Sequence, residues 1–286
     1  SYETLEKAIL NANDGETIKL SADVSVESEI DFTDKAITLD LNGKTIDGKV
    51  PSSYSVIEAK GKSASLTIKD TSSETNGKLI SNNYGISAAE GGKLIIESGT
   101  IESNYAAMAG NNTAGDMNFE VNGGTLTSKF SEAIYMPGQV QLTVNAGEIN
   151  GGISARMGQI TVNGGTINGM TRNQAADKME NYFNYSGSAW IGDAIYIWGG
   201  TYTSNNNSLG NETNVKINGG KINGNAHRAI AIYDIGTNYD QDVTVEISGD
   251  PVVSGDVVID KTYGPQKFNV NASIEIIGGT FSSDVT

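Results

Sequence analysis

Short runs of alternating apolar and polar residues fill the chain, and each run ends at turn-forming residues. One phrase reads apolar, Asn, Gly, Gly, Thr or Lys, apolar, and it recurs at 121–126, 162–167 and 217–222, with diverged copies at 41–46, 96–101, 144–149 and 276–281. A second phrase places a small residue before alternating apolar positions, at 85–88, 106–109, 133–136, 152–155, 194–197 and 229–232. Strict alternation is typical of half-buried strands, and Gly-Gly and Asn-Gly pairs supply the positive φ angles of sharp corners.

These repeats predict an all-β fold, a single-stranded right-handed parallel β-helix of about ten coils with about three strands per coil. The repeat units are too short for a βαβ crossover and too irregular for a propeller blade. Successive coils would stack ~4.8 Å apart. The asparagines before the corner glycines would then stack and bond one another and the backbone, at Asn42, Asn122, Asn145, Asn163 and Asn218.

We expect one β-helix domain over 1–286, with a cap at its start. Within 1–14, Leu5, Ala8, Ile9 and Ala12 form an apolar stripe at helical spacing, which predicts a short N-terminal capping helix. Segment 171–192 breaks the repeat and is predicted to be an inserted loop. Because no cap follows the last repeat copy, we expect the natural protein to continue past residue 286 into flanking domains.

Composition narrows the function classes. The 286 residues include 35 Gly but only 4 Pro and no Cys, which excludes collagen, a disulfide framework and thiolate chemistry. The net charge of −15 argues against nucleic acid and anionic membrane surfaces as partners. The apolar runs are too short to cross a bilayer, so we expect no membrane insertion.

The opening of the chain resembles a known superfamily. Residues 5–20, followed by the run at 37–46, resemble the start of pectin-lyase-like right-handed parallel β-helix proteins, and more narrowly the secreted or surface-anchored repeat proteins of Gram-positive gut bacteria. This resemblance implies an extracellular protein, secreted or attached to the cell wall, that works on or near polysaccharides. It says little about activity, because members of one fold carry out many functions.

The second phrase predicts where a ligand would bind. If it forms one strand per coil, alternation sends one set of side chains inward, at Ile86, Ile134, Ile153, Ile195 and Ile230. The next positions would face outward, at Ser87, Met108, Tyr135, Ser154, Tyr196 and Ala231. We expect a shallow groove of small residues whose walls are formed by Tyr135, Arg156, Tyr196, Trp198 and Tyr233. Sugar rings stack on aromatic faces, and Arg donates to hydroxyls or carboxylates.

The inserted loop would flank this groove with Tyr182, Tyr185 and Trp190. Two plainer interpretations stay open. In the first, the small outward residues reflect tight packing of the coils, and the tyrosines reflect the ordinary preference of tyrosine for strands. In the second, the aromatic residues of the loop pack the loop onto the rod.

Catalysis would need carboxylates or a base. Glu132 and Asp193 occupy the same phrase position two coils apart, about 9.6 Å by the coil spacing, near the upper end of the separation in inverting glycosidases. Arg156 on the intervening coil is a candidate lyase base. The paired Asp and His pattern of polygalacturonases and the acidic calcium cluster of pectate lyases are not found, and no catalytic residue is assigned with certainty.

Calcium is considered because the chain is acidic. Asp240 and Asp242 offer alternating carboxylates, and Asp256 lies in a second acidic segment. Neither segment has the loop pattern of an EF-hand or of glycine-rich nonapeptide repeats. A solvated charged face is the favoured interpretation, and we expect no cofactor.

The sequence therefore predicts an extracellular glycan-recognition or adhesion module without catalysis, whose partner is a polysaccharide or host glycan. The alternatives are a polysaccharide lyase or inverting glycoside hydrolase that uses the same groove, and a passive structural spacer.

Overall fold

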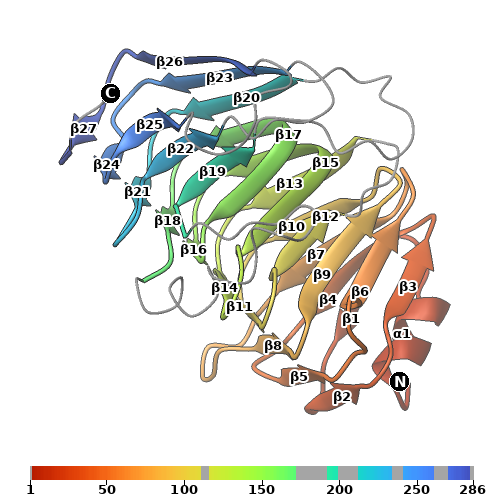
Figure 1. Ribbon diagram of the computed structural model, residues 1–286. Helices are drawn as coiled ribbons and strands as arrows, with labels where there is room; N and C mark the ends of the chain where they lie inside the picture. The colour runs from red at the N-terminus through yellow and green to blue at the C-terminus, as the bar shows by residue number, and fades with distance from the viewer. Residues whose placement is uncertain are drawn as a thin grey trace.

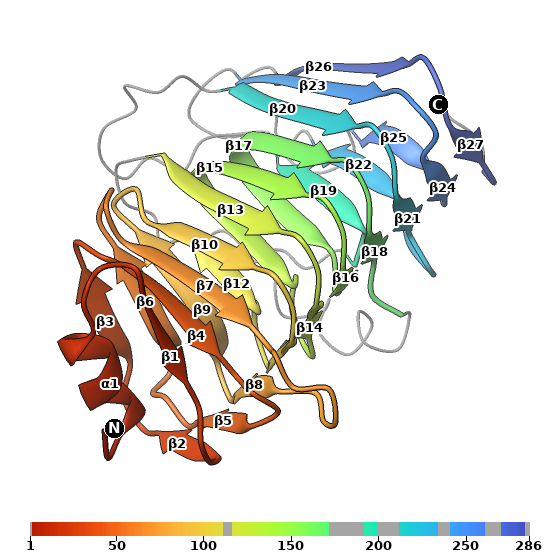
Figure 2. The same ribbon diagram turned by 180° about the vertical axis from the view of Figure 1, so that it is seen from behind.

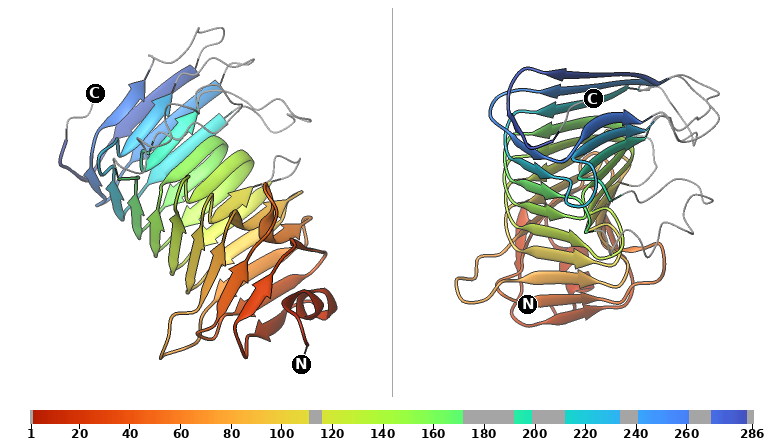
Figure 3. Two further views of the ribbon diagram at one scale, coloured as in Figure 1. Left: turned by 60° about the horizontal axis from the view of Figure 1, so that its bottom comes forward. Right: turned by 60° about the vertical axis from the view of Figure 1, so that its left-hand side comes forward.

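The computed structural model describes residues 2–110, 116–171, 192–198, 212–233, 241–260 and 270–283. These residues form a parallel β-helix, an elongated rod with the helix α1 (Leu5–Asn11) at its N-terminal end (Figures 1 and 3). Each coil contributes one strand to each of three faces, and strands from successive coils pair in parallel. The predicted fold class is confirmed, and the ten-stranded face 3 corresponds to ten coils.

Face 1 is turned toward the viewer in Figure 1 and contains β3 (Ile30–Thr33), β6 (Ser55–Lys60), β9 (Tyr84–Ala89), β12 (Met108–Gly110), the first halves of β15 (Ile134–Val144) and β17 (Ile153–Val162), β19 (Ile195–Trp198), β22 (Ile230–Tyr233) and β25 (Val257–Asp260). Face 2 is turned toward the viewer in Figure 2 and contains β1 (Glu16–Lys19), β4 (Ala36–Asp40), β7 (Ser65–Lys69), β10 (Lys93–Ile96), β13 (Met117–Val121), the second halves of β15 and β17, β20 (Glu212–Ile217), β23 (Gln241–Ile247) and β26 (Val270–Ile276). Face 3 contains β2 (Val24–Val26), β5 (Thr45–Gly48), β8 (Lys78–Ser81), β11 (Thr100–Ser103), β14 (Thr125–Ser128), β16 (Glu148–Asn150), β18 (Thr166–Asn168), β21 (Lys221–Asn223), β24 (Val252–Ser254) and β27 (Thr280–Phe281).

The core is a stack of aliphatic side chains inside the rod. On face 1 the inward column is in register from coil to coil and fully buried, at Ile57, Ile86, Met108, Ile134, Ile153, Ile195, Ile230 and Val257. The predicted inward isoleucines are therefore confirmed. The prediction that Met108 faces outward is wrong: Met108 pairs with Ile86 and Ile134 and points inward. Ala109 takes the outward position and pairs with Ser87 and Tyr135.

An asparagine ladder runs along the corner between faces 2 and 3. Asn145 donates to Asn122 (2.8 Å), Asn163 to Asn145 (2.9 Å) and Asn218 to Asn163 (2.9 Å). The predicted stacking is confirmed for these four. Asn42 is not part of this ladder, because the strand register places Asp40 at the ladder position and Asn42 two residues later. The side-chain amide of Asn42 bonds the Leu20 carbonyl instead.

The glycine of the corner is required by two constraints at once. Gly147 has φ +91°, and a Cβ placed on it would lie 2.7 Å from the carbonyl oxygen of Gly123 in the preceding coil. Only glycine allows this close approach of successive corners.

Helix α1 caps the first coil as predicted. Its apolar stripe is buried, at Leu5, Ala8, Ile9 and Ala12. Thr4 accepts a hydrogen bond from the Lys7 amide at the N-terminus, and the Lys35 ammonium bonds the carbonyls of Ile9 and Ala12 at the C-terminus. Both helix ends are thus satisfied by side chains. Most of the predicted inserted loop, 172–191, lies outside the described residues.

Candidate functional site

The outward column of face 1 is the place where the sequence predicts a groove. From the N-terminal end it consists of Glu58, Ser87, Ala109, Tyr135, Ser154, Tyr196, Ala231 and Val258. Tyr135 is partly exposed, whereas Ser154, Tyr196 and Ala231 in the C-terminal half are buried. Within the column only Glu58, Tyr135 and Val258 are partly exposed, and the other five residues are buried.

Glu132, just before β15, and Tyr196, in β19, form a buried pair. The Tyr196 hydroxyl donates to Glu132 Oε2 at 3.1 Å, and the Ser131 hydroxyl donates to the same oxygen at 2.7 Å. Glu132 is 2% exposed, and burial raises the pKa of its carboxyl, against the two hydrogen bonds and the charge of Arg156, which lower it. The pKa of Tyr196 is raised by burial and by the Glu132 charge.

A second buried group surrounds Asp193. Its carboxylate accepts from the Tyr233 hydroxyl and from the Arg228 amide (3.0 Å). The Arg228 guanidinium bonds the Tyr233 oxygen at 3.2 Å and pairs with Asp260 at 2.5 Å. Burial raises the pKa of Asp193 to about 6, although these hydrogen bonds and the Arg228 charge lower it. The side chains of Asp193, Tyr233, Arg228 and Asp260 are therefore linked, in that order, into one network.

Most of the described residues predicted for the groove and for catalysis are thus brought together, but in a different arrangement from the one expected. Tyr196 and Tyr233 are each 1% exposed, so their rings are not open walls on which a sugar could stack. Arg156 is also buried, at 6%. Trp198 lies beside Tyr233 in the register of β19 and β22, while Tyr182, Tyr185 and Trp190 lie outside the described residues.

The calcium candidates do not assemble in the part of the chain that the structure describes. Asp242 and Asp256 are exposed and belong to no group of three ligand side chains there, and Asp240 lies outside that part. The group that does form is at the other end of the rod, where carboxylate oxygens of Glu29, Asp31 and Glu58 lie within 4.8 Å of one another.

Serine hydroxyls join this acidic group. The Ser55 hydroxyl bonds Glu29 (2.5 Å) and Ser87 (2.6 Å), and Ser87 bonds Glu58 (3.3 Å). Burial raises the pKa of Glu29, and the charges of Asp31 and Glu58 add to this, against the hydrogen bonds from Ser55. The first coils of face 1 therefore present concentrated negative charge.

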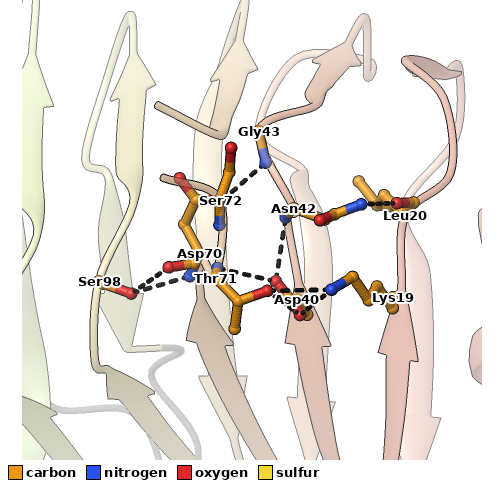
Figure 4. A network of polar contacts seen from close by, with 9 residues as sticks. All are labelled: Lys19, Leu20, Asp40, Asn42, Gly43, Asp70, Thr71, Ser72 and Ser98. Carbon is orange, nitrogen blue, oxygen red and sulfur yellow. Dashed lines mark hydrogen bonds and ion pairs between the residues drawn. The ribbon is translucent and has the colours of Figure 1, made fainter. Parts of the chain in front are cut away.

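Figure 4 shows a fourth polar network, at the corner between faces 2 and 3. Asp40 accepts from Thr71 and Asn42 and pairs with Lys19 at 3.7 Å, while Asp70 accepts from the amides of Gly43 and Gly77. Burial raises the pKa of Asp40, but these hydrogen bonds and the Lys19 charge outweigh it and lower the pKa below its usual value. The two carboxylates satisfy turn amides, which is a structural role.

An aromatic strip that the sequence analysis missed runs along the corner between faces 3 and 1. It consists of Tyr54, Tyr84, Tyr105 and Phe130, one from each of four successive coils. Tyr54 is half exposed and the other three are partly exposed. The rings of Tyr84 and Tyr105 are neighbours, with centroids 5.6 Å apart.

Backbone hydrogen bonds fix this spacing from coil to coil. The Tyr84 amide donates to the Tyr54 carbonyl, and the Phe130 amide donates to the carbonyl of Asn104, next to Tyr105. The Lys129 ammonium lies 4.9 Å from the Phe130 ring centroid and covers that end of the strip. A sequence signal was available, since Tyr54, Tyr84 and Tyr105 each stand directly before a small residue.

No family model, curated protein or solved structure matches the chain. Among the described residues, no helix is long and apolar enough to cross a membrane.

Proposed function

We propose that the protein is an extracellular glycan-recognition module, secreted or attached to the cell wall, that binds a polysaccharide or host glycan without cleaving it. The observation that carries the proposal is the aromatic strip: four rings, at least partly exposed, repeated at one corner of four successive coils. Aromatic rings bury large apolar faces while their polar edges stay in water, which suits the faces of pyranose rings.

The surroundings of the strip support binding of a polar ligand. The Asn104 amide, beside Tyr105, bonds the Asn82 carbonyl at 2.9 Å, so amide groups line the same corner. The partly exposed Tyr135 lies one coil further, on face 1. The resemblance to pectin-lyase-like proteins and to surface repeat proteins of Gram-positive gut bacteria supports the extracellular setting and a role in adhesion.

The burial of the acidic candidates supports binding over catalysis. Glu132 and Asp193 are 2% and 1% exposed, and Oε2 of Glu132 and both carboxylate oxygens of Asp193 accept hydrogen bonds from neighbouring protein groups. A carboxylate that transfers a proton to a substrate must come within hydrogen-bond reach of it.

A glycan array tests the proposal. The wild-type protein should bind a subset of glycans, and the double variant Tyr84→Ala/Tyr105→Ala should lose those signals, while Tyr2→Ala, which removes an exposed tyrosine at the N-terminus, should keep them. No signal from the wild-type protein would favour a passive spacer and contradict the proposal. Signals that the double variant retains would exclude the strip as the binding site.

One observation favours a second candidate, a polysaccharide lyase or glycoside hydrolase. Perturbed carboxyl pKa values cluster at catalytic sites, and burial raises the pKa of Asp193 to about 6 and raises that of Glu132. Release of reducing ends or unsaturated products from a polysaccharide panel, lost in Glu132→Gln or Asp193→Asn, would establish this candidate.

A further inference from the structure

We infer that the strip binds an uncharged, linear polysaccharide whose chain runs along the rod axis, and this inference rests on the proposed function. Two features carry it: the direction in which the aromatic rings repeat and the sign of the charge around them.

The direction follows from the coil stacking. Tyr54, Tyr84 and Tyr105 are carried by three successive coils, so their positions advance along the rod by one coil at a time, ~4.8 Å each. The measured separation of the Tyr84 and Tyr105 ring centroids, 5.6 Å, is of this size, and the ring planes differ by 32°. An extended chain of pyranose rings advances by a comparable distance per sugar. A chain that follows the axis therefore meets a new ring at each sugar, whereas a chain that crosses the strip meets only one.

The charge around the strip selects the ligand class. Glu29 bonds both the amide and the hydroxyl of Ser55, the residue after Tyr54, so one carboxylate lies at the first ring. The carboxylates of Asp31 and Glu58 lie within 4.8 Å of that of Glu29. The whole chain carries −15. A polyuronate or sulfated glycan would bring further negative charge to this surface, and the repulsion would oppose its binding.

The position of Lys129 fits the same inference. Lys129 lies over the Phe130 ring, at the far end from Glu29. It takes up the face of Phe130, so we place the sugars along Tyr54, Tyr84 and Tyr105. Lys49, in the corner that carries Tyr54, is paired with Asp47 at 3.0 Å, and the Lys129 ammonium alone does not offset the three carboxylates at the other end of the strip.

Isothermal titration with defined oligosaccharides tests both parts. Neutral gluco-, manno- and xylo-oligosaccharides of one to six sugars are compared with oligogalacturonates and sulfated oligosaccharides, each with calcium and with a chelator. We expect one neutral series to bind, with affinity rising up to about three sugars and then levelling off, and with little change between ~0.05 and ~0.5 M salt. Tyr84→Ala and Tyr105→Ala should each weaken binding about tenfold or more. The matched control Tyr2→Ala should leave it unchanged.

The possible failures are distinguishable. Binding of an acidic glycan that Tyr84→Ala abolishes, with or without calcium, would overturn the charge inference and leave the proposed function standing. A monosaccharide that binds as tightly as longer chains would overturn the axial direction. A neutral glycan whose binding survives both tyrosine substitutions would overturn the site, and absence of any bound glycan would overturn the proposed function itself. Circular dichroism of each variant verifies that the β-helix is intact.

Discussion

Replacing Tyr196 with Phe tests whether the buried tyrosine–carboxylate pair stabilises the β-helix. The change removes only the hydroxyl that donates to Glu132 Oε2 at 3.1 Å, and it leaves the ring in the same buried position. Above the pKa of Glu132 its carboxylate is charged, and a hydrogen bond to a charged group contributes ~1.5–3 kcal/mol, so in that pH range the free energy of unfolding should fall by this amount. The Ser131 hydroxyl still donates to the carboxylate, which keeps the loss from becoming larger.

A double-mutant cycle assigns this loss to the pair. In a Glu132→Gln background the same hydroxyl bonds a neutral amide oxygen, and a neutral hydrogen bond contributes only ~0.5–1.5 kcal/mol. Tyr196→Phe should therefore cost about half as much in that background, which gives a coupling of ~1 kcal/mol between the two positions. The control is Tyr2→Phe, the same chemical change at an exposed tyrosine, which should stay within ~0.5 kcal/mol of the wild type.

Equilibrium unfolding in urea, followed by circular dichroism, provides the measurement. The slope with denaturant should be the same for all variants, because a changed slope would mean that parts of the rod unfold separately. The reasoning is refuted if Tyr196→Phe unfolds at the wild-type midpoint, or if it costs the same free energy with Glu132 and with Gln at position 132.

Three further predictions concern other parts of the rod. The pKa of Asp193 is about 6 in the folded protein and near 3.8 in the unfolded chain, so ionisation of Asp193 should lower the free energy of unfolding as the pH rises from 4 to 6. Above pH 6 the full loss should be ~3 kcal/mol, and Asp193→Asn should flatten this part of the profile of stability against pH. Equal slopes for the two proteins would contradict this prediction. Asn163→Ala removes two ladder hydrogen bonds and should cost ~1–3 kcal/mol by urea unfolding, and an unchanged midpoint would show that the ladder contributes nothing. Gly147→Ala should destabilise the fold by more than Gly15→Ala, because both have positive φ but only Gly147 lacks space for a Cβ; thermal melts that rank the pair in the opposite order would refute the steric argument.

The period-two pattern and the corner glycines were sufficient to predict the fold. Alternation determines which side chains enter the rod, and positive φ at corners such as Gly147 determines where the chain turns. The register of Met108 needed one more step. From Ser81 to Ile86 and from Ser103 to Met108 the chain has the same number of residues, so counting from the preceding strand places Met108 inward. Aligning the small residues alone gave a register that was wrong by one.

The environment of the candidate site was less predictable. Alternation shows that Tyr196 and Tyr233 point away from the coil interior, but it does not show what covers them. Their partners, Glu132 and Asp193, are 64 and 40 residues earlier in the chain. Contacts over such distances depend on how corners of different length stack, and no local pattern in the sequence encodes them.

Structural and binding roles therefore belong to two different sets of residues. The polar side chains of Glu132 and Asp193 are buried and hydrogen-bonded to neighbouring groups, so substitutions there change stability first. At the corner between faces 3 and 1, Tyr54, Tyr84 and Tyr105 are at least partly exposed, and a substitution there removes surface without opening the core. This division of roles predicts two results together. Tyr84→Ala should lose glycan binding at unchanged stability, and Tyr196→Phe should lose stability. The opposite pairing would place the binding site at the buried polar groups around Glu132 and Asp193.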